Sequence, residues 1–229
     1  MREIVLDTET TGLDPADGHR IIEIGCVELM DHLPTGRSYQ AYLNPERAIP
    51  IEAQRVHGIS DEFLADKPLF AAIADELMEF LGDAPLVIHN AGFDLKFLNS
   101  ELHRLTRPPI PFARAIDTIE IAKAKIPGAR YSLDELCKRF NIDLSARSKH
   151  GALLDAELTA RVYLELVGGR QTRLKLAPLD AEAPAGPGNA RPSRQRVAPL
   201  PSRLTEAERE AHAAFVAKEL GSDPVWSRN

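Results

Sequence analysis

The sequence has few cysteines and no long apolar run. Its 229 residues include two cysteines, Cys26 and Cys137, which lie far apart and outside any C-x-x-C pair. This usage argues against a disulfide scaffold and is typical of reduced, buried thiols. The N-terminal run M-R-E-I-V-L-D-T-E contains charges and is not a signal peptide, and no stretch is long enough to span a membrane. We therefore expect a cytoplasmic protein.

Basic residues are scarce in most of the chain. The net charge is -6, and residues 1–169 contain 27 acidic but only 18 basic residues, whereas residues 170–203 contain 7 basic and 2 acidic ones. Affinity for nucleic-acid phosphates usually comes from Lys and Arg, so we expect the chain alone to bind such a substrate weakly. Bound metal ions would offset part of the acidic charge.

Apolar periodicity predicts an α/β domain over residues 1–169. The expected strands are 3–6, 20–30, 38–43 and 86–88. The expected helices are 69–81, 93–105, one that begins at Ser132 with Glu135 in a capping box, and 152–167. Because strands come first and then alternate with helices, we expect a mixed sheet flanked by helices.

The composition changes after Gly169. Six prolines lie within residues 178–201, so residues 170–203 are predicted to be a disordered, flexible linker. Order is expected to return in residues 204–229, where Thr205 and Glu208 form a capping-box pattern before a helix that continues to Leu220.

Acidic residues lie at the end of one predicted strand and at the starts of two predicted helices. Asp7 and Glu9 are expected just past the first strand, where positions i and i+2 share one face. Asp94 follows a buried strand and begins a helix, and His150 and Asp155 lie five residues apart at the start of the last helix. Each signal has a plain alternative, since D-x-E is common and Asp94 could merely interact with the helix dipole.

The combination of these five residues predicts a two-metal nuclease site. Carboxylates suit hard cations such as Mg2+, and two such ions can hold the attacking and the leaving oxygens of a phosphodiester. A nearby histidine can deprotonate the attacking water. Another acid, Asp117, is expected to cap a helix and not to bind metal.

Three motifs resemble those of the DEDD exonuclease superfamily, in its histidine subgroup. They are D-T-E-T-T-G at 7–12, H-N-A-G-F-D-L-K-F-L at 89–98 and H-G-A-L-L-D at 150–155. The resemblance implies an RNase H-like fold and 3′-to-5′ exonuclease activity with two Mg2+ or Mn2+ ions. It implies that Asp7, Glu9, Asp94 and Asp155 bind the metal ions and that His150 is the catalytic base.

The segment I-P-I-E-A-Q-R-V-H-G-I-S-D-E-F-L at 49–64 is similar to the proofreading, or epsilon, branch of that family. This similarity implies that Glu52 and His57, beside Asp7 and Glu9, contact the terminal nucleotide of a single-stranded or frayed DNA 3′ end. The alternative for His57 is a loop histidine that packs near Val56 and Ile59.

Two features of the tail resemble partner-binding segments of that branch. Q-T-R-L-K-L at 171–176 resembles a sliding-clamp motif with Gln171, Leu174 and Leu176 as anchors, although it could be an ordinary linker start. The final helix with Trp226 resembles the segment that docks on the alpha subunit of DNA polymerase III, since an exposed Trp suits an interface.

Two other functions stay open from the sequence. A stand-alone exoribonuclease or RNA-maturation nuclease would use the same five residues but has no need of the tail. Sugar selectivity depends on contacts to a 2′-hydroxyl, which the sequence does not reveal. A catalytically silent polymerase scaffold would have no reason to keep the complete set of site residues.

Overall fold

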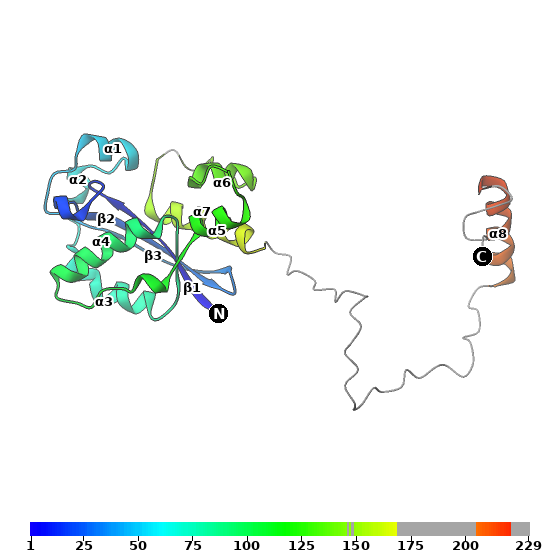
Figure 1. Ribbon diagram of the computed structural model, residues 1–229, viewed down its shortest axis with the longest axis horizontal. Coiled ribbons are helices and arrows are strands. Elements are labelled where there is room, and N and C mark those ends of the chain that lie inside the picture. Colours follow the sequence, from blue (N-terminus) through cyan, green and yellow to red (C-terminus); the bar gives the residue numbers. More distant parts are fainter. Residues whose placement is uncertain (146, 148, 169–204, 221–229) are drawn as a thin grey trace, which may run out of the picture. The chain divides into compact units, whose positions relative to one another are not determined.

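The computed structural model describes residues 1–145, 147, 149–168 and 205–220 (Figure 1). The chain divides into two units, Met1–Lys175 and Leu176–Asn229, and each is described by itself. Across these described ranges, no helix is both long and apolar enough to cross a membrane.

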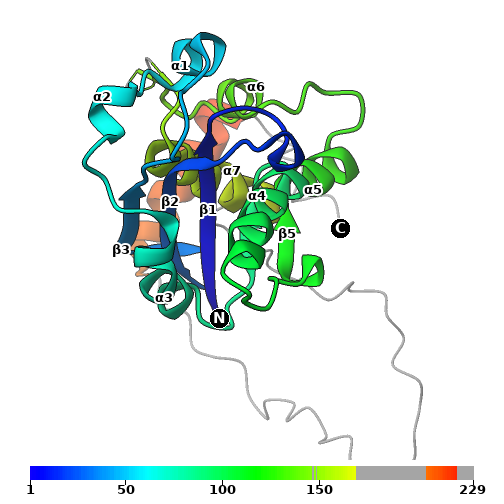
Figure 2. The ribbon, with the colours of Figure 1, turned by 90° about the vertical axis from the view of Figure 1, so that its left-hand side faces the viewer.

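The described part of the first unit contains a five-stranded mixed sheet in the order β3-β2-β1-β4-β5 (Figure 2). The strands are β1 Arg2–Thr10, β2 Ile21–Met30, β3 Leu33–Tyr42, β4 Leu86–Ile88 and β5 Ala115–Asp117. The first three strands are antiparallel neighbours, whereas β4 runs parallel to β1 and β5 runs parallel to β4. The predicted mixed α/β architecture is confirmed.

Alternation along β1 directs its side chains to two separate cores. Ile4 and Leu6 pack with helices α3 (Phe70–Leu81) and α4 (Ala91–Arg104) on one face of the sheet. Val5 faces the opposite side and packs with α7 (Ala152–Val167). Because successive residues of a strand point to opposite faces, Asp7 and Glu9 share the α7 face with Val5.

Shorter helices complete the domain. They are α1 Ile51–His57, α2 Asp61–Leu64, α5 Thr118–Lys125 and α6 Leu133–Arg139. Leu136 of α6 and Val162 of α7 belong to a further apolar cluster, which also contains Cys137. Cys26 and Cys137 are both free and buried, as predicted.

Several element boundaries differ from the sequence-based expectation. β1 continues through Asp7 and Glu9 to Thr10, so placing these acids past the strand was wrong. β3 begins at Leu33, five residues before the expected Ser38, because it forms a hairpin directly with β2. The Ser132 side chain accepts a hydrogen bond from the Glu135 backbone N–H, which is half of the predicted capping box, while the Glu135 carboxylate pairs with Lys138. Asp117 caps α5, as predicted.

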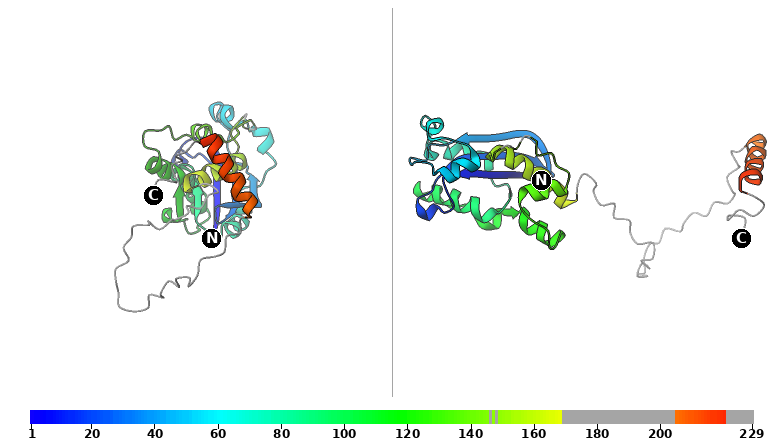
Figure 3. Two further views of the ribbon diagram at one scale, coloured as in Figure 1. Left: turned by 90° about the vertical axis from the view of Figure 1, so that its right-hand side faces the viewer. Right: turned by 90° about the horizontal axis from the view of Figure 1, so that it is seen from above.

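The described part of the second unit is the helix α8, Glu206–Phe215, which continues as a π-helical turn over Val216–Leu220 (Figure 3). The predicted capping box of Thr205 and Glu208 is present. No residue of α8 is buried. The clamp-like residues Gln171, Leu174 and Leu176, the remainder of the predicted linker, and Trp226 lie outside the described residues.

Candidate active site

The site begins on β1, where the chain places two carboxylates on one face. Asp7 and Glu9 alternate with Thr8, whose side chain points to the opposite, α4 face. Glu9 is 9% exposed. The expected pairing of Asp7 with Glu9 therefore holds, although it arises within the strand and not beyond its end.

Gly25 allows helix α7 to approach the sheet beside these acids. A Cβ atom at Gly25 would lie 2.2 Å from the backbone nitrogen of Leu153, in the first turn of α7. Gly25 is also the β2 partner of Asp7 in the strand register. The start of α7 therefore rests directly on β2 beside Asp7, which brings His150 and Asp155 to the same place.

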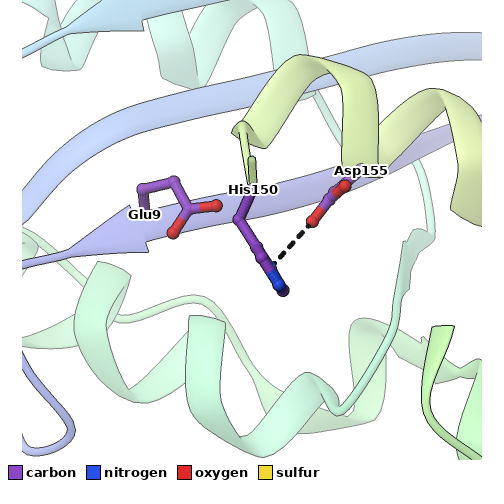
Figure 4. Close-up of side chains that lie close together, drawn as sticks. All are labelled: Glu9, His150 and Asp155. Atoms are coloured by element: carbon purple, nitrogen blue, oxygen red, sulfur yellow. Dashed lines mark ion pairs between the residues drawn. The ribbon is translucent and has the colours of Figure 1, made fainter. Parts of the chain in front are cut away.

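The side chains of Glu9, on β1, and of His150 and Asp155, at the start of α7, lie close together (Figure 4). One ligand atom from each residue lies within 4.8 Å of the others, a spacing that can hold a metal ion. Asp155 is buried, whereas His150 is exposed. The Nδ1 atom of His150 lies 3.3 Å from Oδ2 of Asp155.

Asp94 reaches the same strand from the opposite face of the sheet. Its Oδ1 atom accepts hydrogen bonds from the backbone nitrogen and the hydroxyl of Thr8, at 2.9 and 2.8 Å. Thr8 lies between Asp7 and Glu9, so these bonds fix the Asp94 carboxylate against the acidic part of β1. Asp94 lies in the first turn of α4, at the start of a helix as predicted, and contributes its carboxylate to the cluster.

Burial and mutual repulsion shift the pKa values of these carboxyl groups upward. Desolvation and repulsion from Asp94 and Asp155 raise the pKa of the Asp7 carboxyl well above its ordinary value, although the residue keeps partial solvent exposure. Desolvation raises the pKa of Glu9 to about 8, and repulsion from Asp155 adds to the shift. Desolvation also raises the pKa of Asp94, against the hydrogen bonds from Thr8. A divalent cation with oxygen ligands fits this donor set.

Glu23 is a residue of the site that the sequence analysis did not identify. It is 2% exposed and lies opposite Glu9 in the register of β1 and β2. Its Oε2 atom accepts a hydrogen bond from the Ala152 backbone nitrogen at 3.1 Å, and its Oε1 accepts one from Gln40 at 2.8 Å. Glu23 therefore anchors the first turn of α7. The only signal in the sequence is a single acid within the apolar run I-I-E-I-G.

Arg147 is the second residue that the sequence analysis missed. Its Nε and Nη2 atoms each donate to one carboxylate oxygen of Asp155, both at 2.6 Å. Its Nη1 atom donates to Asp134 at 2.5 Å. No motif marked this arginine, because its importance comes from a side chain that folds back onto the helix following it.

Beside the carboxylates lies a cavity of about 560 Å³. Glu9, Glu52 and His57 line it together with Leu13 and Phe93. Its size and position suit one nucleotide next to the acidic cluster.

His57 ends helix α1 and is 6% exposed, so it does not lie in a loop as the alternative interpretation had it. Its Nδ1 atom accepts a hydrogen bond from the Ile59 backbone nitrogen at 3.0 Å. Its Nε2 atom is buried without a hydrogen-bond partner in the described structure.

Sequence comparisons match this arrangement to known proteins. The family model described as exonuclease, RNase T, matches residues 4–163. A DNA polymerase III subunit epsilon from Rickettsia felis is 49% identical over 223 residues, which cover 96% of this chain and 97% of the relative. The Escherichia coli K12 protein of the same name is 45% identical over 240 residues, with 98% and 97% covered.

Solved structures share the fold. Exonuclease X in complex with 5′ overhanging duplex DNA has a TM-score of 0.57 and 28% identity, and the match covers 72% of this chain and 90% of that one. The nuclease domain of 3′hExo, a DEDDh family member bound to rAMP, has a TM-score of 0.63 and 22% identity, covering 72% and 91%. The predicted RNase H-like exonuclease fold is confirmed by these matches.

Proposed function

Because the chain belongs to the exonuclease family, in the group of the DNA polymerase III epsilon subunits, we propose that it is the 3′-to-5′ proofreading exonuclease of a replicative DNA polymerase. The observation that carries this proposal is the single acidic cluster that β1, α4 and the start of α7 form together. Asp7, Glu9, Asp94, His150 and Asp155 come from these three segments.

Enzymes of this family use divalent metal ions, and here we assign two Mg2+ or Mn2+ ions to the cluster. Asp7, Glu9 and Asp155 would hold one ion, while Asp7 and Asp94 would hold the other. Bound there, the ions would acidify the attacking water and offset charge on the phosphodiester. The exposed imidazole of His150 would accept the proton of that water, and a nucleoside 5′-monophosphate would leave.

The cavity beside Glu9 would hold the terminal nucleotide. Glu52 and His57 line it, so both would lie beside the sugar or phosphate of that nucleotide. A 3′ end must unpair before it can enter such a cavity. A mismatched end unpairs at a lower free-energy cost than a matched one. Preference for mismatched ends would therefore come from the stability of the duplex end and not from contacts that recognise the base.

We further propose three parts: the exonuclease domain 1–169, a linker 170–203 with a clamp-binding motif at Gln171, Leu174 and Leu176, and a segment 204–229 that docks on the polymerase alpha subunit. Support for the docking segment comes from α8, on which Ala207, Ala211, Ala214 and Phe215 share one helical face. Phe215 is 57% exposed, as an apolar residue of a protein interface would be before its partner binds.

The test is a comparison of 3′-end removal from single-stranded DNA and RNA of one sequence, by the purified chain with Mg2+. We expect faster cleavage of DNA. Replacing Asp7 by Ala should abolish cleavage with little loss of fold, because it removes a shared metal ligand and relieves carboxylate repulsion. Residual cleavage by that variant would contradict the site assignment, and a strong preference for RNA would indicate RNA processing instead.

A further inference from the structure

Arg147 binds the carboxylate of Asp155, one of the proposed metal ligands. Its Nε and Nη2 atoms donate to the two oxygens of Asp155 at 2.6 Å, and the two side chains are 8% and 4% exposed. A bidentate, charge-assisted contact of this kind is among the stronger hydrogen-bonded pairs in proteins. While it persists, an arginine proton takes up one lone pair on each oxygen of Asp155.

The same arginine also lies beside the candidate base. Its Nη2 atom lies 2.9 Å from Nδ1 of His150. That Nδ1 atom also lies 3.3 Å from Oδ2 of Asp155, so Arg147, His150 and Asp155 form one group of contacting side chains.

Asp134 gives Arg147 a position outside the cluster. Its carboxylate, which is 47% exposed, accepts from the Nη1 atom of Arg147. The contact to Asp134 uses a different nitrogen from those that bind Asp155, so the arginine can keep it when it releases Asp155. A cation that binds Asp155 therefore has to displace only the two hydrogen bonds from Arg147 to Asp155, because the bond from Arg147 to Asp134 can remain.

We propose that Arg147 competes with the divalent ion for the carboxylate of Asp155 and withdraws from it when the ion binds. The inference rests on the proposed metal ligands, because it treats Asp155 as one of them. Arg147 is in this sense a positioning residue, since it acts on the ion through the ligand that it holds.

The test is calorimetric titration of the full chain with Mn2+, without DNA, for the wild type, Arg147→Gln and Arg147→Lys. Arg147→Gln should bind Mn2+ about tenfold more tightly, equivalent to about 1.4 kcal/mol, since the ion no longer displaces the fork. Arg147→Lys keeps the charge but loses the bidentate geometry, so its affinity should fall between the two. Circular dichroism would verify that each variant folds.

Lys149→Gln is the matched control. It removes one positive charge from the same loop, but its ammonium contacts the Arg55 carbonyl and not a carboxylate of the site. Its Mn2+ affinity should stay close to that of the wild type. An equal gain in Lys149→Gln would show a general charge effect and overturn the proposal. If Arg147→Gln binds Mn2+ with the wild-type affinity, the proposal for Arg147 is wrong but the proposed metal site is not affected. If neither the wild type nor any variant binds Mn2+, the proposed metal site is wrong as well.

Discussion

At the scale of single residues, the raised pKa of Glu9 should make the stability of the folded protein depend on pH. Its pKa is about 8 in the folded protein, against 4.5 for an ordinary glutamate, and Asp7 is shifted in the same direction. The folded state therefore holds protons that the unfolded chain has released. Between these values, stability without metal falls as pH rises, by at most about 1.4 kcal/mol per pH unit for each such carboxyl group.

The effect of the carboxyl groups is best measured between pH 7 and pH 8, where the opposing effect of the histidines is small. Desolvation lowers the pKa values of His57 and His89, which makes stability rise with pH until both are neutral in the unfolded chain as well. Above that point the carboxyl groups should dominate, so urea unfolding in EDTA should give a lower free energy of unfolding at pH 8 than at pH 7. The variant Glu9→Gln should show a shallower decline. A flat profile in the wild type would contradict the shifted pKa values.

Some residues of the site could be predicted from sequence motifs, whereas others could be identified only from their contacts in the folded structure. Asp7, Glu9 and Asp94 were predicted because the types and spacing of their side chains match a known chemistry. Glu23 and Arg147 were not, since their roles depend on contacts with the start and the first turn of α7. A single acid in an apolar strand, or an arginine in a loop, has many plain explanations until the neighbours are known.

At the scale of elements, the start of α7 is the part of the fold on which the site depends most. Gly25→Ala would place a Cβ atom within 2.4 Å of the backbone at Ala152 and Leu153, where no flexible side chain can move aside. We expect a loss of about 1–3 kcal/mol from overpacking, together with weaker Mn2+ binding as His150 and Asp155 shift. Urea unfolding and Mn2+ titration would measure both.

Gly36→Ala is a suitable control for that experiment, since a Cβ at Gly36 meets no atom within 4 Å. Its φ of +89° adds local strain, so some loss of stability is expected there, but its Mn2+ affinity should not change. Full Mn2+ affinity in Gly25→Ala would show that the close approach of α7 does not position the ligands.

Long periodic elements were predictable and short or polar ones were not. The bounds of α7 were predicted from apolar spacing and the glycine after Val167. The end of β1 was missed because Asp7, Thr8 and Glu9 are polar, and only pairing with β2 keeps them extended. Helices α1 and α2 have 7 and 4 residues, which is too short for a period to be visible.

At the scale of the whole molecule, we expect catalysis and polymerase binding to be separable. The apolar clusters on both faces of the sheet consist of residues from the first unit. A fragment of residues 1–169 should therefore fold and cleave single-stranded DNA within about twofold of the full chain, because its core and its site are complete. The same fragment should lose affinity for the polymerase alpha subunit in size-exclusion chromatography.

Limited proteolysis of the full chain tests this division independently. The proline-rich composition of residues 178–201 predicts that cleavage begins there and leaves a stable fragment of the exonuclease domain. That fragment, isolated from the digest, should keep its exonuclease rate, with Asp7→Ala as the control for contaminating nucleases. An inactive fragment would mean that residues beyond 169 complete the site, and a fragment that still binds the alpha subunit would place the docking surface on the exonuclease domain.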